Sequence, residues 1–401
     1  MILAARKSTY LFILLLTSFH LVSCAQQQNN STTIKTGADQ TELYLKLLKG
    51  KQVAVVANQT SVIFKENRSK KQETRHLVDS LLALGIHIKK VFAPEHGFRG
   101  EADAGERVKD GIDTKTGLPI FSLYGKNKKP SKEQLKEIDV IVFDIQDVGA
   151  RFYTYISTLH YVMEAAAESR IPVIVLDRPN PNGHYIDGPV LEIEHKSFVG
   201  MHPVPVVYGM TIGEYGKMIN GEKWLTNGIQ AKLTVIPLKN YTHQSEYSLP
   251  IKPSPNLPND TSINLYPSLC FFEGTSVNAG RGTNMQFQVY GSPFLNHRSK
   301  FTYTPSPNEG AKYPKHAHMI CYGEDLRNSP KLNELNLSWL IKAKKQNTTK
   351  NFFNDFFTKL AGTTKLREQI EQGLTEEEIK TSWTKDLKMF QKVRERYLIY
   401  K

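Results

Sequence analysis

The feature that most constrains the fold is an alternation of short, mainly apolar runs with segments of helical spacing. The apolar runs lie at residues 52–57, 86–93, 119–124, 139–144, 171–176 and 233–238. Runs of this length are typical of strands that are buried on both faces of a sheet. Segments between them carry apolar residues at helical spacing, as at 74–84, and another helix is expected to begin at Ser131. The alternation therefore predicts an α/β fold, in which right-handed crossovers join the strands of a mainly parallel sheet.

The length of the chain, 401 residues, is enough for two domains of ordinary size. A proline-rich run at 251–260 marks the expected boundary between them. We expect the parallel sheet within residues 41–250 and a second domain at 251–401. Most of the last third should be helical, with helices at 335–344, 352–360, 364–371 and 375–397.

The N-terminus is predicted to be a lipoprotein signal peptide at residues 1–24. Arg6 and Lys7 precede an apolar stretch too short to span a bilayer comfortably, and it ends in L-V-S-C at Cys24. This ending resembles a bacterial lipobox, whose cysteine is lipidated, and an ordinary secretory signal is the alternative. Residues 25–40 are polar and are expected to be a tether. Since no aspartate follows Cys24, we expect a lipid-anchored protein of the outer membrane that faces the periplasm.

Charge and cysteine content limit the partners. The net charge of +13 suits an acidic partner, but the basic residues are scattered and accompany no nucleic-acid-binding motif. We therefore expect no nucleic-acid partner. Apart from Cys24, the cysteines are Cys270 and Cys321, which could pair or remain buried thiols, and neither has zinc-site spacing.

Polar clusters follow four of the predicted strands, at residues 58–61, 95–99, 147–155 and 177–182. The carboxyl ends of parallel strands meet at one edge of a sheet, so these clusters can share one cleft. The most concentrated cluster places Glu95, His96 and Arg99 within five residues. Its position at a strand end predicts that it belongs to a functional site.

Each cluster also has a purely structural interpretation. Glu95 could cap a helix or pair with Arg99, and Asp147 could be a turn residue with Arg151 as its ion-pair partner. The asparagines at 177–182 are natural turn formers beside proline and glycine, and the tyrosines at 153–155 could simply pack. The convergence of the clusters, rather than any one residue, favours a functional site.

The sequence lacks the motifs of several other kinds of functional site. Glu95 and His96, with Asp103, could serve a metal-dependent amidase or deacetylase, but no H-E-x-x-H spacing is present and we expect no metal. There is no G-x-S-x-G nucleophile elbow, no P-loop and no G-x-G-x-x-G after the first strand. We therefore expect no nucleotide cofactor, and no cofactor of any other kind.

Glycoside hydrolysis fits the residue types better. It needs a carboxylic acid that protonates the leaving oxygen and a second group that acts as nucleophile or base. Glu95 can supply the acid, and Glu273 or Asp147 the second group. A bidentate arginine suits a carboxylate such as the lactyl group of N-acetylmuramic acid.

Four motifs resemble the family known as DUF1343. They are F-A-P-E-H-G-F-R-G at 92–100, D-I-Q-D-V-G-A-R-F-Y-T-Y at 144–155, D-R-P-N-P-N-G at 177–183 and F-E-G-T-S-V-N-A-G-R-G-T at 272–283. The characterised members are exo-β-N-acetylmuramidases of the NamZ type, glycoside hydrolase family 171. The resemblance covers residues 45–400, with the motifs in the family's order.

The resemblance implies an enzyme that releases terminal N-acetylmuramic acid from the non-reducing end of peptidoglycan fragments, during turnover and recycling of the cell wall. It implies a Rossmann-like N-terminal domain and a smaller α+β C-terminal domain that completes the cleft. A glycan-binding lipoprotein without catalysis is the alternative.

The resemblance also ranks the site residues. Glu95 is the leading catalytic candidate, with Glu273 and Asp147 as candidates for the second group. Asn278 precedes Ala279 where we associate the family with S-E-G-R-G-T or S-V-G-R-G-T, so an acidic residue is absent there and Glu273 is favoured. The residues expected to bind the substrate are His96, Arg99, Arg151, Tyr153, Asn180, Asn182 and Arg281.

Overall fold

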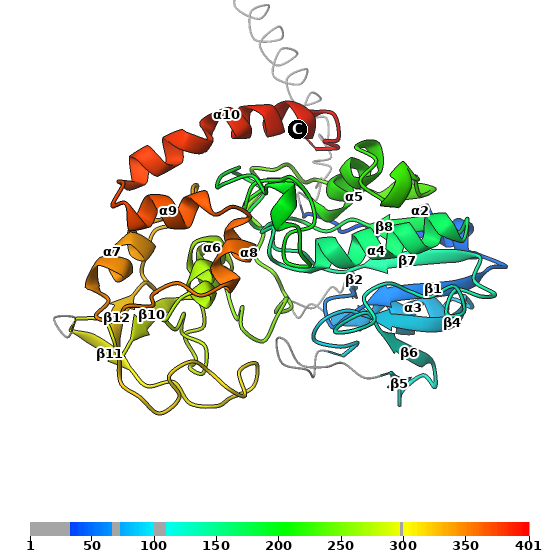
Figure 1. The fold of residues 1–401 in the computed structure, drawn as a ribbon. Coiled ribbons are helices and arrows are strands. Elements are labelled where there is room, and N and C mark those ends of the chain that lie inside the picture. The colour runs from blue at the N-terminus through cyan, green and yellow to red at the C-terminus, as the bar shows by residue number, and fades with distance from the viewer. Residues whose placement is uncertain (1–32, 66–72, 100–109, 297–299, 401) are drawn as a thin grey trace, which may run out of the picture. The chain divides into compact units, whose positions relative to one another are not determined.

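The central element of the fold is a seven-stranded sheet, shown in Figure 1. The structure is a computed structural model that describes residues 33–65, 73–99, 110–296 and 300–400. Cys24, with the predicted signal peptide, and Asp103 lie outside the described residues. The strands of the sheet are β1 (Gln52–Ala57), β4 (His87–Ala93), β5 (Gly111–Ile112), β6 (Pro119–Ser122), β7 (Val140–Asp144), β8 (Val173–Leu176) and β9 (Leu233–Ile236).

The strand order is β5-β6-β4-β1-β7-β8-β9, and all neighbours pair in parallel except β5, which is antiparallel to β6. In chain order, the six parallel strands therefore lie as 3-2-1-4-5-6, the arrangement of a Rossmann-like doubly wound sheet. The predicted fold class is confirmed. The order reverses at β1, which lies between β4 and β7, and ligands of such sheets bind beyond the carboxyl ends of the strands at this point.

Burial on both faces explains why β1 is a continuous apolar run. Val53, Val55 and Ala57 belong to one core cluster, whereas Ala54 and Val56 belong to another. Successive side chains of a strand point to opposite faces, so the sheet separates the two clusters. Helices α2 (Thr41–Leu48) and α3 (Leu77–Ala83) pack into the first cluster, and α4 (Tyr155–Glu168) and α5 (Ile212–Gly221) pack into the second.

The chain after the proline-rich run combines helices with a small antiparallel sheet. The sheet has the order β10-β12-β11, with β10 at Val289–Ser292, β11 at Phe301–Tyr303 and β12 at Cys321–Asp325. The helices are α6 (Asp260–Leu269), α7 (Ser338–Gln346), α8 (Phe356–Ala361), α9 (Lys365–Glu371) and α10 (Glu376–Glu395), which Figure 1 draws in yellow-green to red. The predicted helices of this region are present, and each begins one to four residues later than predicted. The domain boundary at residue 251 stays a prediction.

Two local predictions differ from the structure. Residues 74–76 were expected to be helical, but they belong to β3 (Glu73–His76), which forms a hairpin with β2 (Val62–Lys65). The helix begins only at Leu77, because the His76 side chain accepts a hydrogen bond from Val78 N and caps it there. The helix expected from Ser131 is a series of turns, although Ser131 and Gln134 do exchange capping hydrogen bonds.

The open question of the two cysteines has an answer in the structure: Cys270 and Cys321 are buried free thiols. Across the described ranges, no helix combines the length and apolar character needed to cross a membrane.

Candidate active site

A cavity of about 250 Å³ lies beyond the sheet edge at which β4 and β7 end. Glu95 follows β4, and the segment 152–154 follows β7, so the strands that flank β1 at the switch point both contribute to it. The other walls come from the chain after β6, the segment 198–199, the proline-rich run and the C-terminal region. The lining residues are Glu95, His96, Tyr124, Phe152, Tyr153, Thr154, Phe198, Val199, Ser254, Asn256, Leu257, Tyr266, Cys270, Glu273, Arg281, Phe287, Phe356 and Leu360.

A tight turn directly after β4 presents Glu95 to the cavity. Gly97 N donates to Pro94 O at 3.1 Å, and His96 and Gly97 have positive φ values of 69° and 79°. Glycine adopts this region without penalty, but a histidine in it is uncommon, and such strain collects at functional sites. This turn therefore directs Glu95 from the end of a buried strand toward the cavity.

Two hydroxyl groups hold the Glu95 carboxylate. Thr154 Oγ1 donates to Glu95 Oε2 at 2.9 Å, and the Tyr124 hydroxyl also hydrogen-bonds this carboxylate. Burial is the main cause that raises the pKa of Tyr124, and the negative charge of Glu95 is the second. Tyr124 therefore stays a neutral donor at any physiological pH. Thr154 occupies the cap position of α4 but makes no side-chain capping bond, so its hydroxyl is left for Glu95.

Glu273 and Arg281, which also line the cavity, form an ion pair. Arg281 Nη1 lies 2.9 Å from Glu273 Oε1, and Nη2 donates to Gly310 O at 3.1 Å. The charges of Glu95, Glu273 and Arg281 all act on the Tyr124 hydroxyl. The two carboxylates and the guanidinium therefore share one small space.

A lysine holds the backbone that carries Glu273. Lys315 Nζ donates to the carbonyls of residues 272, 273, 275 and 277 at 2.7–3.2 Å. Burial lowers the pKa of Lys315 to about 8. Because the ammonium group has four carbonyl partners, its role is structural: it fixes the turn after α6, which carries Glu273.

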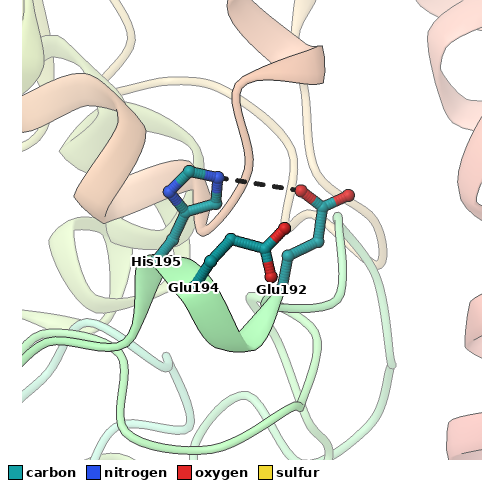
Figure 2. Close-up of side chains that lie close together, drawn as sticks. All are labelled: Glu192, Glu194 and His195. Atoms are coloured by element: carbon teal, nitrogen blue, oxygen red, sulfur yellow. Dashed lines mark ion pairs between the residues drawn. The ribbon is translucent and has the colours of Figure 1, made fainter.

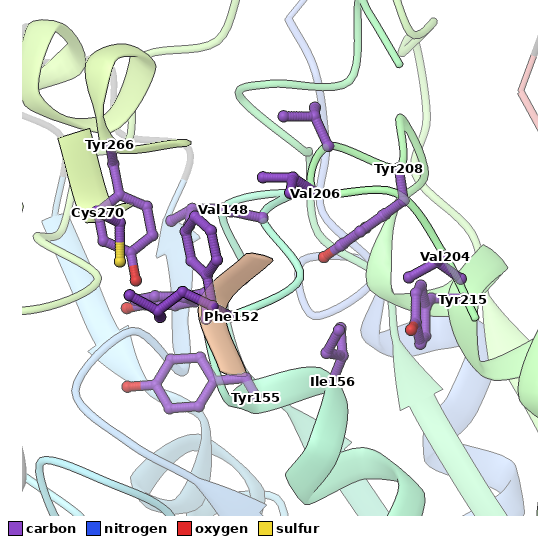
Figure 3. Packing of buried hydrophobic residues seen from close by; sticks show 14 of the residues in the cluster. Val148, Phe152, Tyr155, Ile156, Val204, Val206, Tyr208, Tyr215, Tyr266 and Cys270 are labelled. Atoms are coloured by element: carbon purple, nitrogen blue, oxygen red, sulfur yellow. The ribbon is translucent and has the colours of Figure 1, made fainter. Parts of the chain in front are cut away.

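The apolar walls are aromatic. Figure 3 shows the Phe152 side chain beside Tyr266 of α6 and Cys270 of the turn that follows it. The Phe152 and Tyr266 rings meet edge to face, with centroids 5.4 Å apart. Tyr153 packs in the same way on Tyr266, and its hydroxyl donates to Pro253 O at 2.7 Å. Aromatic walls around charged groups suit a sugar, which has apolar C–H faces and polar edges.

The structure brings five of the predicted site residues together, namely Glu95, His96, Tyr153, Glu273 and Arg281. Asp147, proposed as a second catalytic carboxylate, does not line the cavity. It is buried and accepts hydrogen bonds from the Tyr208 hydroxyl and from Gly149 N. Burial raises its pKa to about 6. These contacts agree with the interpretation of Asp147 as a turn residue.

Arg151 lies apart from the cavity and pairs with carbonyls rather than with Asp147. The fully buried guanidinium donates to Pro189 O, Val204 O, Leu360 O and Ala361 O at 2.6–2.9 Å. It therefore ties segments that lie more than 200 residues apart in the sequence.

The remaining candidates also make structural contacts outside the lining. Arg99 pairs with Asp113 at 2.8 Å and with Asp79 at 3.5 Å. Asn180 donates to Met210 O and accepts from Asn182 N, and Asn182 Nδ2 donates to Val148 O and Ile263 O. Both asparagines are buried turn residues, so their side-chain amides are already used within the protein.

Three residues at the site did not figure among the sequence candidates. Thr154 lies inside the motif at 144–155, and Tyr124 follows a strand end, so the strand-end rule could have found both. Asn256 belongs to the proline-rich run, which was interpreted only as a boundary.

The possible metal ligands lie elsewhere. Within the part of the chain that the structure describes, the group close enough to hold a cation is Glu192, Glu194 and His195, at the 3-10 turn Ile193–His195. Figure 2 shows the pairing of His195 with Glu192, 3.8 Å apart. Glu192 also accepts hydrogen bonds from Thr363 and Lys365. Glu95 and His96 are not members of this group.

The fold and the cavity together define a hydrolase of the glycosidase class. Beyond the switch point of a Rossmann-like sheet lie two carboxylates, the pair of groups that glycoside cleavage requires, together with an arginine and aromatic side chains. The chain belongs to the NamZ exo-β-N-acetylmuramidase family: it matches the family's N-terminal part over residues 53–261 and its C-terminal part over residues 264–400.

Comparisons with individual proteins support this family membership. The chain is 39% identical to the peptidoglycan β-N-acetylmuramidase NamZ of Bacillus subtilis, over 98% of this chain and all of that protein. It is similar to the crystal structures of two DUF1343 family proteins from Bacteroides fragilis. The first has a TM-score of 0.83 at 44% identity, the second 0.76 at 29%, and each comparison covers 92% of this chain and 99% of the other. The resemblance noted from the motifs is confirmed.

Proposed function

We propose that the protein is an exo-acting glycoside hydrolase that releases terminal N-acetylmuramic acid from the non-reducing end of peptidoglycan fragments. The observation that carries the proposal is the joint presence of Glu95 and the Glu273–Arg281 pair in one cavity, in a chain of the NamZ family. Such an activity would serve turnover and recycling of the cell wall.

The size of the cavity supports exo action. Its volume of about 250 Å³ lies just below the roughly 300–1,000 Å³ of sites that hold drug-sized ligands. A space of this volume suits one substituted sugar ring. The terminal sugar would enter, while the rest of the substrate stays outside.

In the proposed mechanism, Glu95 is the general acid. Its carboxyl group would donate a proton to the glycosidic oxygen as the bond to the sugar breaks. Thr154 and Tyr124 bind the carboxyl group, and so they limit its rotation and keep it aimed at that oxygen. Glu273 would act as the nucleophile or as the base that activates water.

Arg281 would have two tasks in this arrangement. It holds the Glu273 carboxylate through Nη1, and it bears the positive charge that a substrate carboxylate needs. The lactyl group of N-acetylmuramic acid is such a carboxylate, whereas N-acetylglucosamine has none. Arg281 would therefore contribute to the choice between these two sugars.

The test is a direct assay of product. Protein that begins after residue 24 is mixed with the disaccharide in which N-acetylmuramic acid is β-1,4-linked to N-acetylglucosamine, and the products are separated by chromatography. Release of both monosaccharides supports the proposal, and Glu95→Gln serves as the matched inactive control. Folded protein that binds the disaccharide in calorimetry without cleaving it would instead favour a glycan-binding protein.

We also propose that lipid on Cys24 anchors the protein to the outer membrane, facing the periplasm. The support is the L-V-S-C motif and the polar residues after it. Fractionation of cells that express the full chain is the test: Cys24→Ser should move the protein from the membrane to the soluble fraction. Unchanged membrane association would argue against the anchor.

A further inference from the structure

The most exposed large hydrophobic side chain in the described part of the protein is an aromatic one. Tyr313 is 97% exposed, whereas the next most exposed large hydrophobic residue, Ile112, is 69% exposed. Both faces of the Tyr313 ring are therefore open to solvent. A free aromatic ring is a common means of binding sugars, because a pyranose can bury its apolar C–H face against it.

The backbone on the N-terminal side of Tyr313 is fixed to the wall of the cavity. Gly310 O accepts a hydrogen bond from Asn256 Nδ2 at 2.6 Å and another from Arg281 Nη2 at 3.1 Å. Asn256 and Arg281 both line the cavity. Only two residues separate Gly310 from Tyr313.

The backbone on the C-terminal side is fixed to the same wall. A Cβ atom placed on Gly282 would come within 2.6 Å of the Pro314 ring, so Pro314 packs directly on the residue after Arg281. Lys315 follows, and its ammonium group donates to Glu273 O and three neighbouring carbonyls. Consecutive Cα atoms are about 3.8 Å apart, so Tyr313 lies one residue from the contact between Pro314 and Gly282, and Gly282 directly follows the lining residue Arg281.

Tyr313 is thus a solvent-exposed ring on a backbone segment that is anchored on both sides next to residues of the cavity wall. If the terminal sugar fills the cavity, as the proposed function requires, the next sugar of the substrate must lie at the rim. We propose that Tyr313 is a stacking platform for the sugar on the leaving-group side of the scissile bond. This inference rests on the proposed function and adds to it a binding site for the second sugar.

The test compares two substrates that differ only on the leaving-group side. One is the disaccharide, whose leaving group is N-acetylglucosamine, and the other is methyl β-N-acetylmuraminide, whose leaving group has no ring to stack. Tyr313→Ala should lower kcat/KM for the disaccharide about three- to tenfold, mainly by raising KM. It should leave the methyl glycoside unaffected. Tyr313→Phe keeps the ring and should behave as the wild type.

The control is Met389→Ala, which removes an exposed side chain on α10, outside the lining of the cavity. This variant should match the wild type on both substrates. Wild-type activity of Tyr313→Ala on the disaccharide, or an equal loss on both substrates, would overturn the inference.

A binding measurement separates this inference from the proposed function. In the Glu95→Gln background, calorimetry with the intact disaccharide should show Kd raised about three- to tenfold by Tyr313→Ala and unchanged by Tyr313→Phe. If the wild type cleaves neither substrate, the proposed function fails, and an unchanged Kd in this experiment would overturn the platform by itself.

Discussion

Thr154 Oγ1 lies 2.9 Å from Glu95 Oε2, although the two residues are 59 positions apart in the sequence. One follows β4 and the other precedes α4, so the contact crosses the point where the strand order of the sheet reverses. A residue at a helix N-terminus commonly uses its hydroxyl to cap the helix. Here the hydroxyl binds the carboxylate that we propose as the general acid, and this is the most direct link between the fold and the chemistry.

The first prediction concerns this contact. Thr154→Val keeps the shape of the side chain and removes the hydroxyl, so we expect kcat to fall about tenfold or more. A hydrogen bond to a charged group contributes about 1.5–3 kcal/mol, and about 1.4 kcal/mol corresponds to a factor of ten. Thr154→Ser keeps the donor and should retain most activity. Equal activity of the two variants, at equal melting temperature, would show that the contact does not position Glu95.

The second prediction separates Asp147 from catalysis. The carboxyl group is buried, and among the described residues Oδ1 has no hydrogen-bond partner. Asp147→Asn can keep the bonds from Tyr208 and Gly149 through its own oxygen. We therefore expect this variant to release muramic acid at the wild-type rate, whereas a catalytic Asp147 predicts a large loss.

The same variant should also change how stability depends on pH. Burial raises the pKa of Asp147 to about 6 in the folded protein. In the unfolded protein its pKa is near 4, so between about pH 4 and pH 6 the folded state binds the proton more tightly than the unfolded state does. The contribution of this group to the free energy of unfolding therefore falls as the pH rises through this range. Asn carries no such charge. Asp147→Asn should therefore be more stable than the wild type at pH 7–8, by about 1–3 kcal/mol in urea unfolding. An identical pH profile would contradict the account.

The third prediction concerns Arg281. Its guanidinium bridges Glu273 and Gly310 with different nitrogens, which a lysine ammonium on a flexible stem cannot reproduce with the same geometry. Arg281→Lys should lower kcat/KM for the disaccharide about 10- to 100-fold while keeping the positive charge. Steady-state kinetics would measure the effect. Retention of full activity would reduce the role of Arg281 to charge alone.

The sheet could be predicted from the sequence because each strand is marked by the residues of one short run. The runs at β1, β7 and β8 are continuous and apolar, and burial on both faces demands this. The hairpin of β2 and β3 could not be predicted in the same way. Residues 74–76 have apolar neighbours at helical spacing, and only pairing with residues 62–64 makes them a strand.

The site could be predicted in part for a related reason. The strand-end rule directed attention to Glu95, which lines the cavity, but it gave the same weight to Arg151 and Asn182, which do not. Whether a side chain at a strand end points into a cleft or into the protein depends on the backbone angles of its loop and on its tertiary partners. Arg151 turns inward to carbonyls contributed by segments far along the chain, and no local pattern reports those partners.

The measurement that tests the central claim most directly is the effect of Glu95→Gln on two substrates. The account predicts that this variant folds normally and cleaves the disaccharide about 10²–10⁴-fold more slowly than the wild type. It predicts a clearly smaller loss on p-nitrophenyl β-N-acetylmuraminide, because a nitrophenolate departs without protonation. Activity within a few-fold of the wild type on the disaccharide would contradict the assignment of Glu95 as the acid.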